Sequence, residues 1–190
     1  MFQNVPHDMT ALADRAGLLR LRERNLAADV MREFSTRFPE LFFAVYTGTF
    51  RNHENMRIAG FWLLNRRAFE NDHDLTNDSC VLLVMDVERK AATLSFGYRL
   101  DAYLDEEDTF SCLAKAHPHW IEARYADGIA ALIEGLKKIL IRRCTHARRK
   151  ARQSDSHTAE AAASRAIHEV GCEQSKSLQK ENDQDQEVDP

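Results

Sequence analysis

The chain has 190 residues, of which 44% are hydrophobic, and a formal net charge of −4 at pH 7. This length allows one well-buried core, and the small net charge excludes a protein whose overall field recruits nucleic acid or anionic membrane. The four cysteines lie far apart and form no C-x-x-C pair, which argues against a zinc ribbon and against a disulfide-rich secreted scaffold.

The start of the chain, MFQNVPHDMTALADRAGLL, lacks the charged-then-apolar layout of a signal peptide. No apolar run approaches the roughly 18 residues that a membrane-spanning helix needs. We therefore expect no transmembrane segment and a cytoplasmic protein, with association to the cell envelope possible through a partner.

Composition divides the chain near residue 150. Residues 1–150 contain the apolar and aromatic runs of an α/β domain, which ends in a basic helix. Residues 151–190 are polar and acidic without an aromatic residue, so they cannot bury enough apolar surface to offset the entropy of ordering. We expect this segment to be a largely disordered tail.

The first predicted elements are a helix, a strand and a second helix. An amphipathic helix over residues 18–38 has apolar side chains every four residues and ends before a proline. LFFAVYTG, residues 41–48, is typical of a buried strand. The next helix, over about residues 54–69, carries four large apolar side chains near one side. The first helix has Leu26, Val30, Phe34 and Phe38, and the second has Ile58, Phe61, Trp62 and Phe69.

The second half of the domain predicts a hairpin followed by two helices. Residues 80–87 and 92–98 are strand-like and are joined by a short polar connection, which favours an antiparallel pair. Residues 106–117 and 120–145 are predicted helices, separated by a break at Pro118. The order α-β-α-β-β-α-α predicts an α/β fold, a three-layer α/β/α sandwich around a small mixed sheet.

Two acid-rich loops, residues 71–78 and 101–108, lie on the same predicted edge of this sheet. The first loop enters the strand at residues 80–87, and the second leaves the neighbouring strand, which runs in the opposite direction. The second loop belongs to SFGYRLDAYLDEED, a run with more carboxylates than a turn needs. We expect the two loops to be close in space.

Several segments together resemble the TPM-domain family, over roughly residues 10–140. In chain order they are LADRAGLL, FFAVYTG, FWLLNRRAF, NDSCVLLVMDVERKAATLSFGYRLDAYLDEED and ARYADGIAALIEGL. That family includes thylakoid-lumen phosphatase-like proteins and bacterial envelope proteins. The resemblance implies a three-layer α/β/α domain that binds calcium or hydrolyses phosphate esters, or that acts as an accessory subunit.

The chain departs from the family pattern at two places. Ser79 and Cys80 replace an Asn-Gly pair, and Arg99 replaces the second glycine of a Gly-Tyr-Gly motif, whereas Asp101 and Asp105 keep its acidic positions. An arginine in place of glycine either blocks a ligand or supplies positive charge where a metal would sit. We therefore assign Arg99 as a phosphate or partner contact.

Four aspartates are the candidate metal ligands. Carboxylate oxygens suit Ca²⁺ or Mg²⁺, the only cofactors that the sequence suggests. The alternative is that these acids face water, or complement the start of a helix. The four residues are Asp14, Asp78, Asp101 and Asp105.

Other residues give weaker signals. His73, the pair His117 and His119, and Cys80 are better explained as exposed or buried structural residues than as ligands or a nucleophile. The basic residues of 137–152 could meet anionic lipid or RNA, but cations near a helix C-terminus also stabilise the helix without a partner.

Two functions of different classes fit these observations. The first is a TPM-like protein-interaction or accessory module of non-catalytic or weakly catalytic type, in which an ion orders the acidic loops. The second is a metal-dependent (Ca²⁺ or Mg²⁺) phosphatase that acts on phosphate esters, which leaves open whether the protein is an enzyme. We prefer the module, because the sequence shows no convincing nucleophile or general base and no catalytic residue can be assigned.

Overall fold

The computed structural model describes residues 9–50, 55–65, 69–70, 75–147 and 149. The chain divides into two units, Met1–Arg143 and Cys144–Pro190, and the fold described below is that of the first. The predicted tail at 151–190 and His73 both lie outside the described residues.

A mixed four-stranded sheet forms the centre of the first unit, with strand order β2-β3-β5-β6. The first three of these strands are parallel, and β6 is antiparallel to β5, as the hairpin prediction requires. Two further short strands, β1 and β4, pair with each other in parallel. The strands are β1 (Met9–Thr10), β2 (Leu12–Asp14), β3 (Phe42–Gly48), β4 (Phe69–Glu70), β5 (Cys80–Asp86) and β6 (Ala91–Phe96).

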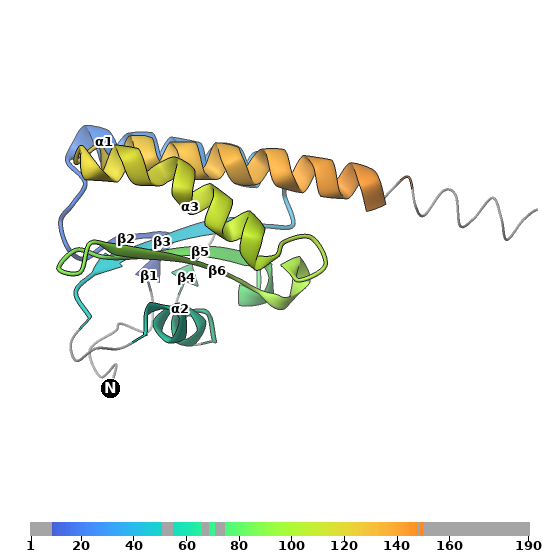
Figure 1. Cartoon of the computed structure of the whole chain (residues 1–190), viewed down its shortest axis with the longest axis horizontal. Coiled ribbons are helices and arrows are strands. Elements are labelled where there is room, and N and C mark those ends of the chain that lie inside the picture. The colour runs from blue at the N-terminus through green and yellow to red at the C-terminus, as the bar shows by residue number, and fades with distance from the viewer. Residues whose placement is uncertain (1–8, 51–54, 66–68, 71–74, 148, 150–190) are drawn as a thin grey trace, which may run out of the picture. The chain divides into compact units, whose positions relative to one another are not determined.

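Helices cover both faces of the sheet (Figure 1). One face carries α1 (Leu21–Arg37), α3 (Glu106–Ile121) and a helix at residues 125–147, named the final helix below; the other face carries α2 (Met56–Asn65). Two short 3₁₀ turns, η1 (Asn77–Ser79) and η2 (Tyr98–Leu100), flank the β5–β6 hairpin. The predicted three-layer α/β/α sandwich with a small mixed sheet is thus confirmed, and the seven predicted elements occur in the predicted order.

The core has two parts, because successive side chains of a strand point to opposite faces of the sheet. Every residue of β3 and β5 is buried, which explains why their sequences are continuous apolar runs. On the three-helix face Leu83 packs with Phe34 of α1 and Ile133 of the final helix. On the other face Leu82 packs with Leu63 of α2.

Pro118 does not break the helix, contrary to the prediction, and α3 continues through it to Ile121. A proline inside a helix removes one N–H and leaves the carbonyl four residues earlier without its usual partner. Here that carbonyl belongs to Ala114, and both residues are exposed, so water can bond to it. The proline also lies close to the end of the helix, where few later bonds are disturbed.

The inward side of α2 differs from the side that the largest apolar residues suggest. Gly60 faces β6 so closely that a Cβ at this position would overlap the Ser95 side chain. The buried residues are therefore Ala59, Gly60, Leu63 and Leu64. Ile58 and Phe61 turn away from the sheet and are 61% and 57% exposed.

Candidate functional site

Asp14 lies at the end of β2, where the protein's own donors hold its carboxylate. The backbone N–H groups of Leu18 and Leu19 donate to its two oxygens at 3.0 and 2.9 Å, and the Thr47 hydroxyl donates to Oδ1. Gly17, with a φ of 66°, allows the chain to turn back over the carboxylate. Partial burial raises the pKa of Asp14, but the bonds from Thr47, Leu19 and Leu18 outweigh it and lower the pKa.

The structure does not bring Asp14 together with the other predicted metal ligands. In the register of the sheet Asp14 is level with Met85, near the end of β5, whereas Asp78 and Asp101 lie beside the start of that strand at Cys80. Five residues of strand separate the two levels by about 17 Å. No single ion can therefore contact both groups.

Asp78, Asp101 and Arg99 do share one edge of the sheet. Gly97 lies so close to η1 that a Cβ on it would overlap the backbone of Asp78, and this contact holds η1 and η2 side by side. Both aspartates are exposed. Arg99 is also exposed and donates from Nη1 to Oγ of Ser79 at 3.3 Å. The two acid-rich loops thus meet through η1 and η2, although residues 71–74 lie outside the described part of the chain.

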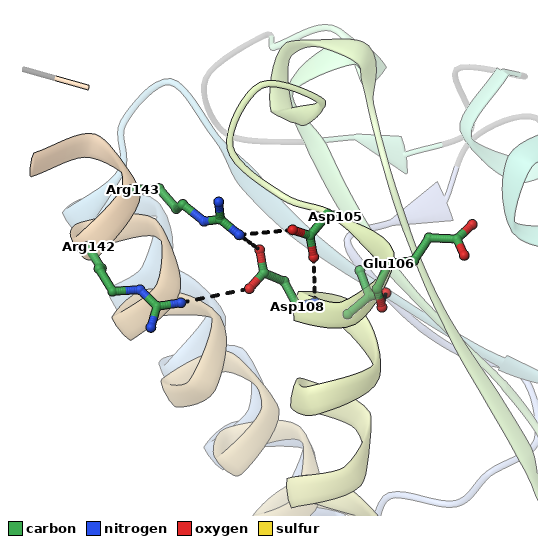
Figure 2. Close-up of polar contacts among 6 residues, drawn as sticks. Asp105, Glu106, Asp108, Arg142 and Arg143 are labelled. Atoms are coloured by element: carbon green, nitrogen blue, oxygen red, sulfur yellow. Dashed lines mark hydrogen bonds and ion pairs between the residues drawn. The ribbon is translucent and has the colours of Figure 1, made fainter. Parts of the chain in front are cut away.

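Asp105, the fourth predicted ligand, caps α3 and pairs with an arginine (Figure 2). Its Oδ1 accepts from the backbone N–H of Asp108 at 2.8 Å. Arg143, on the final helix, donates from Nη2 at 2.9 Å to both Asp105 and Asp108, and Arg142 lies 3.9 Å from Asp108. The bond from Asp108 N–H and the charge of Arg143 lower the pKa of Asp105, and the charge of Asp108 raises the pKa of Arg143.

These four residues form a charged clamp between α3 and the final helix. The side chain of Asp108 is only 9% exposed, whereas those of Arg142 and Arg143 are 72% and 43% exposed. In the sequence alone, the acids at 101–108 and the basic residues at 137–152 are separate features. Asp108 and Arg143 are 35 residues apart in the sequence, and their contact depends on the antiparallel packing of the two helices.

The clamp closes one end of a groove of about 440 Å³ between the two helices. The groove continues toward Ser111 and Lys115 on α3 and Lys138 on the final helix. Ser111 and Lys115 are four residues apart, so they lie on one side of α3, and this spacing is the signal that could have identified them. The lining residues are Asp105, Glu107, Asp108, Ser111, Lys115, Gly135, Lys138, Ile139, Arg142 and Arg143.

Asp86, at the end of β5, is a buried carboxylate that the sequence analysis did not single out. Its Oδ1 accepts from the backbone N–H groups of Glu88 and Arg89 at 3.1 and 3.3 Å, and its Oδ2 lies 3.6 Å from Nε of Arg89. These contacts shape the turn between β5 and β6. Within the described residues, no group of three or more His, Cys, Asp and Glu side chains is arranged to hold a metal ion.

An ion pair links the start of α2 to the start of α3, and exposed apolar side chains lie on both helices near it. Arg57 donates to Glu106 at 2.5 Å. Ile58 and Phe61 follow Arg57 on the outer side of α2, and Phe110, 72% exposed, follows Glu106 by one turn of α3. We name the α2 pair Ile58 and Phe61 the apolar surface; Phe110 lies on α3, on the other face of the sheet.

Comparisons with known proteins show similarity of fold and no family. No known family and no curated protein matches the chain. The N-terminal domain of a protein from P. gingivalis, solved by NMR, is similar with a TM-score of 0.55 at 20% identity, over 72% of this chain and 88% of that chain.

Two more NMR structures are similar to the chain in fold at low sequence identity. The BA42 protein from the psychrophilic bacterium Bizionia argentinensis has a TM-score of 0.53 at 12% identity, over 66% of this chain and 83% of its own. The N-terminal domain of the cg2496 protein from Corynebacterium glutamicum has a TM-score of 0.52 at 9% identity, over 67% of this chain and 77% of its own. At these identities the likeness supports the α/β fold alone.

The thiols of Cys80 and Cys112 are buried, and Lys137 of the predicted basic segment is paired with two acids. Burial raises the pKa of the Cys80 thiol well above its usual range and that of Cys112 to about 11, so neither is a ready nucleophile. Lys137, the first residue of the predicted basic surface at 137–152, donates to Glu33 and Glu134 at 2.6 Å. Among the helices that the structure describes, none is long and apolar enough to cross a membrane.

Proposed function

We propose that this TPM-like domain is a protein-interaction or accessory module and that it binds its partner through the apolar surface. The observation that carries the proposal is the composition of α2. Only one of its ten residues, Arg57, is charged, and its sequence is MRIAGFWLLN. A helix that is apolar on all sides is normally buried on all sides. Ile58 and Phe61 are exposed here, so a protein partner is the natural cover for them.

The state of the predicted acids also supports a module rather than an enzyme. Asp14 and Asp105 accept hydrogen bonds that the fold needs, from a loop and a helix start. Engaged carboxylates of this kind are poor general bases, since their donors hold them in the charged form at low pKa. An ion that bound the exposed Asp78 and Asp101 would order the η1 and η2 turns of the module.

Metal-dependent hydrolysis of phosphate esters is the second candidate function. It is favoured by one observation, the shared position of Asp78, Asp101 and Arg99 at the η1–η2 edge. In that function the two carboxylates would hold Ca²⁺ or Mg²⁺, which polarises the phosphoryl oxygen, and Arg99 would stabilise its charge.

Partner capture with matched variants tests the module. The wild-type chain, the double variant Ile58→Ser with Phe61→Ser, and the control Leu21→Ser are each used as bait, and bound proteins are identified by mass spectrometry. Leu21 is 75% exposed but lies on α1, on the other face of the sheet. We expect proteins that both the wild type and the control retain and the double variant loses. Equal capture by all three would contradict a role for the apolar surface.

A turnover assay separates the two functions. Release of nitrophenol from p-nitrophenyl phosphate is followed with Ca²⁺, with Mg²⁺ or with chelator, for the wild type and for Asp78→Asn with Asp101→Asn. We expect no metal-dependent turnover. Turnover that requires metal and disappears in the double variant would replace the module by the phosphatase.

A further inference from the structure

The groove between α3 and the final helix contains polar groups that the fold does not use. The hydroxyl of Ser111 and the ammonium groups of Lys115 and Lys138 line it, and none of the three has a hydrogen-bond or ion-pair partner among the described residues. By contrast, Lys137 and Arg143 of the final helix are paired with acids. The unpaired donors are therefore gathered in one part of the groove.

Gly135 helps to place Lys115 over the groove. A Cβ built at Gly135 would lie 3.5 Å from Cδ and 3.7 Å from Nζ of Lys115, so the lysine side chain lies across the glycine on the final helix. A lysine that extends straight into water would not show this contact. The exposed Lys115 side chain thus lies along Gly135, with its ammonium group at the groove.

The charges of the groove leave a local excess of positive charge near Ser111. At the clamp end, Asp105 and Asp108 already neutralise Arg143, and Arg142 lies near Asp108. These acids are therefore not free to neutralise the lysines. Of the remaining lining residues Lys115 and Lys138 are positive and only Glu107 is negative.

We propose that this groove binds a phosphoryl group, the dianion of a phosphate monoester, through Lys115, Lys138 and Ser111. Two ammonium groups match the two charges of the dianion, and the hydroxyl gives a third donor to its oxygens. A carboxylate has one charge and fewer acceptor positions. The phosphoryl group belongs either to a small phosphate ester or to a phosphorylated side chain of a protein. The inference does not depend on the apolar surface, and it concerns binding without metal or turnover.

Calorimetric titration of the full chain with O-phosphoserine at pH 7.5, low salt and excess chelator tests the site. Removing both ammonium groups, with Lys115→Ala and Lys138→Ala, should weaken binding about tenfold or more, because each is a charge-assisted donor. Both lysines are exposed, so the variant should fold. Glu107→Gln should tighten binding about threefold, since the opposing charge is removed. Arg22→Ala, an exposed cation of α1 outside the groove, should leave binding within about twofold of wild type.

Two further titrations identify the source of the phosphoryl group. A neutral peptide with one phosphoserine that binds more tightly than O-phosphoserine assigns a protein source, and equal or weaker binding assigns a small phosphate ester. In both cases binding should weaken when the pH falls below about 6, where the dianion takes up a proton. No saturable binding at millimolar ligand, or equal losses in Arg22→Ala and the lysine variant, would overturn the proposal.

Discussion

Two acidic regions of the molecule use their carboxylates in different ways. Asp14 accepts from neutral donors, which are two backbone N–H groups of its own loop and a hydroxyl of the neighbouring strand. Asp105 and Asp108 accept from the guanidinium group of Arg143 on another helix. The first arrangement fixes a turn and joins it to β3, whereas the second holds two helix ends together across the surface.

The difference shows how an acid-rich sequence can serve the fold without a metal ion. Buried neutral donors lose much free energy when their acceptor is removed, because water does not replace it easily. An ion pair whose arginine is exposed contributes less, since water and salt compete for the guanidinium group. We therefore expect the Asp14 loop to matter more for stability than the charged clamp does.

The largest expected effect is that of Asp14→Ala, which leaves Leu18 N–H, Leu19 N–H and the Thr47 hydroxyl without their acceptor. We expect a loss of about 3 kcal/mol in the free energy of unfolding, measured by urea denaturation. Thr47→Val removes one donor to Asp14 and the weak 3.4 Å acceptor of the Ala16 N–H, but it keeps the bonds from Leu18 and Leu19, so it should cost about 1 kcal/mol. Equal losses in the two variants would show that the loop bonds contribute little.

The pH dependence of stability should come from the same loop. The folded pKa of Asp14 lies below its unfolded value, so the contribution is present above the unfolded pKa and is lost as the pH falls through the folded pKa. The free energy of unfolding should thus decrease when the pH falls below 3.8, the ordinary value for the group. In Asp14→Asn this decrease should be smaller. An identical pH profile in wild type and variant would contradict the assignment.

The charged clamp should have a smaller effect that depends on salt. We expect Asp108→Ala to lower the free energy of unfolding by about 1 kcal/mol at low salt, because a nearly buried carboxylate and its bonds to Arg143 are lost. About 0.5 M NaCl should reduce this loss, whereas the loss in Asp14→Ala should hardly change. If salt changes both losses equally, the two regions do not differ as described.

Much of the fold was predictable because its strands are buried on both faces. The runs that became β3 and β5 are mostly apolar, and a central position in a covered sheet produces that pattern. The three residues of β2 are too few to show any period, and the strand forms only through pairing with β3. The strand that places Asp14 at the opposite edge from Asp78 was therefore not predictable from its sequence.

The candidate sites were less predictable because they depend on tertiary contacts. Arg143 is 35 residues from Asp108 in the sequence, and the pair exists only because α3 and the final helix pack side by side. The outward position of Ile58 and Phe61 depends on Gly60, which allows α2 to approach β6 through its smallest residue. Hydrophobicity alone favours the opposite orientation of the helix.

Added Ca²⁺ should have the smallest effect of all, and it sharpens the comparison. An ion at Asp14 or at Asp105 must displace donors that the fold already supplies, so we expect millimolar Ca²⁺ to raise Tm by less than about 1 °C. Asp78 and Asp101 are exposed and accept no side-chain hydrogen bond from the described residues, so we assign any rise to them and expect it to vanish in Asp78→Asn with Asp101→Asn. A rise in Tm that persists in that variant but vanishes in Asp14→Asn would mean that Asp14 binds the ion in place of the N–H groups of its loop. That result would contradict the assignment of Asp14 as a structural acceptor.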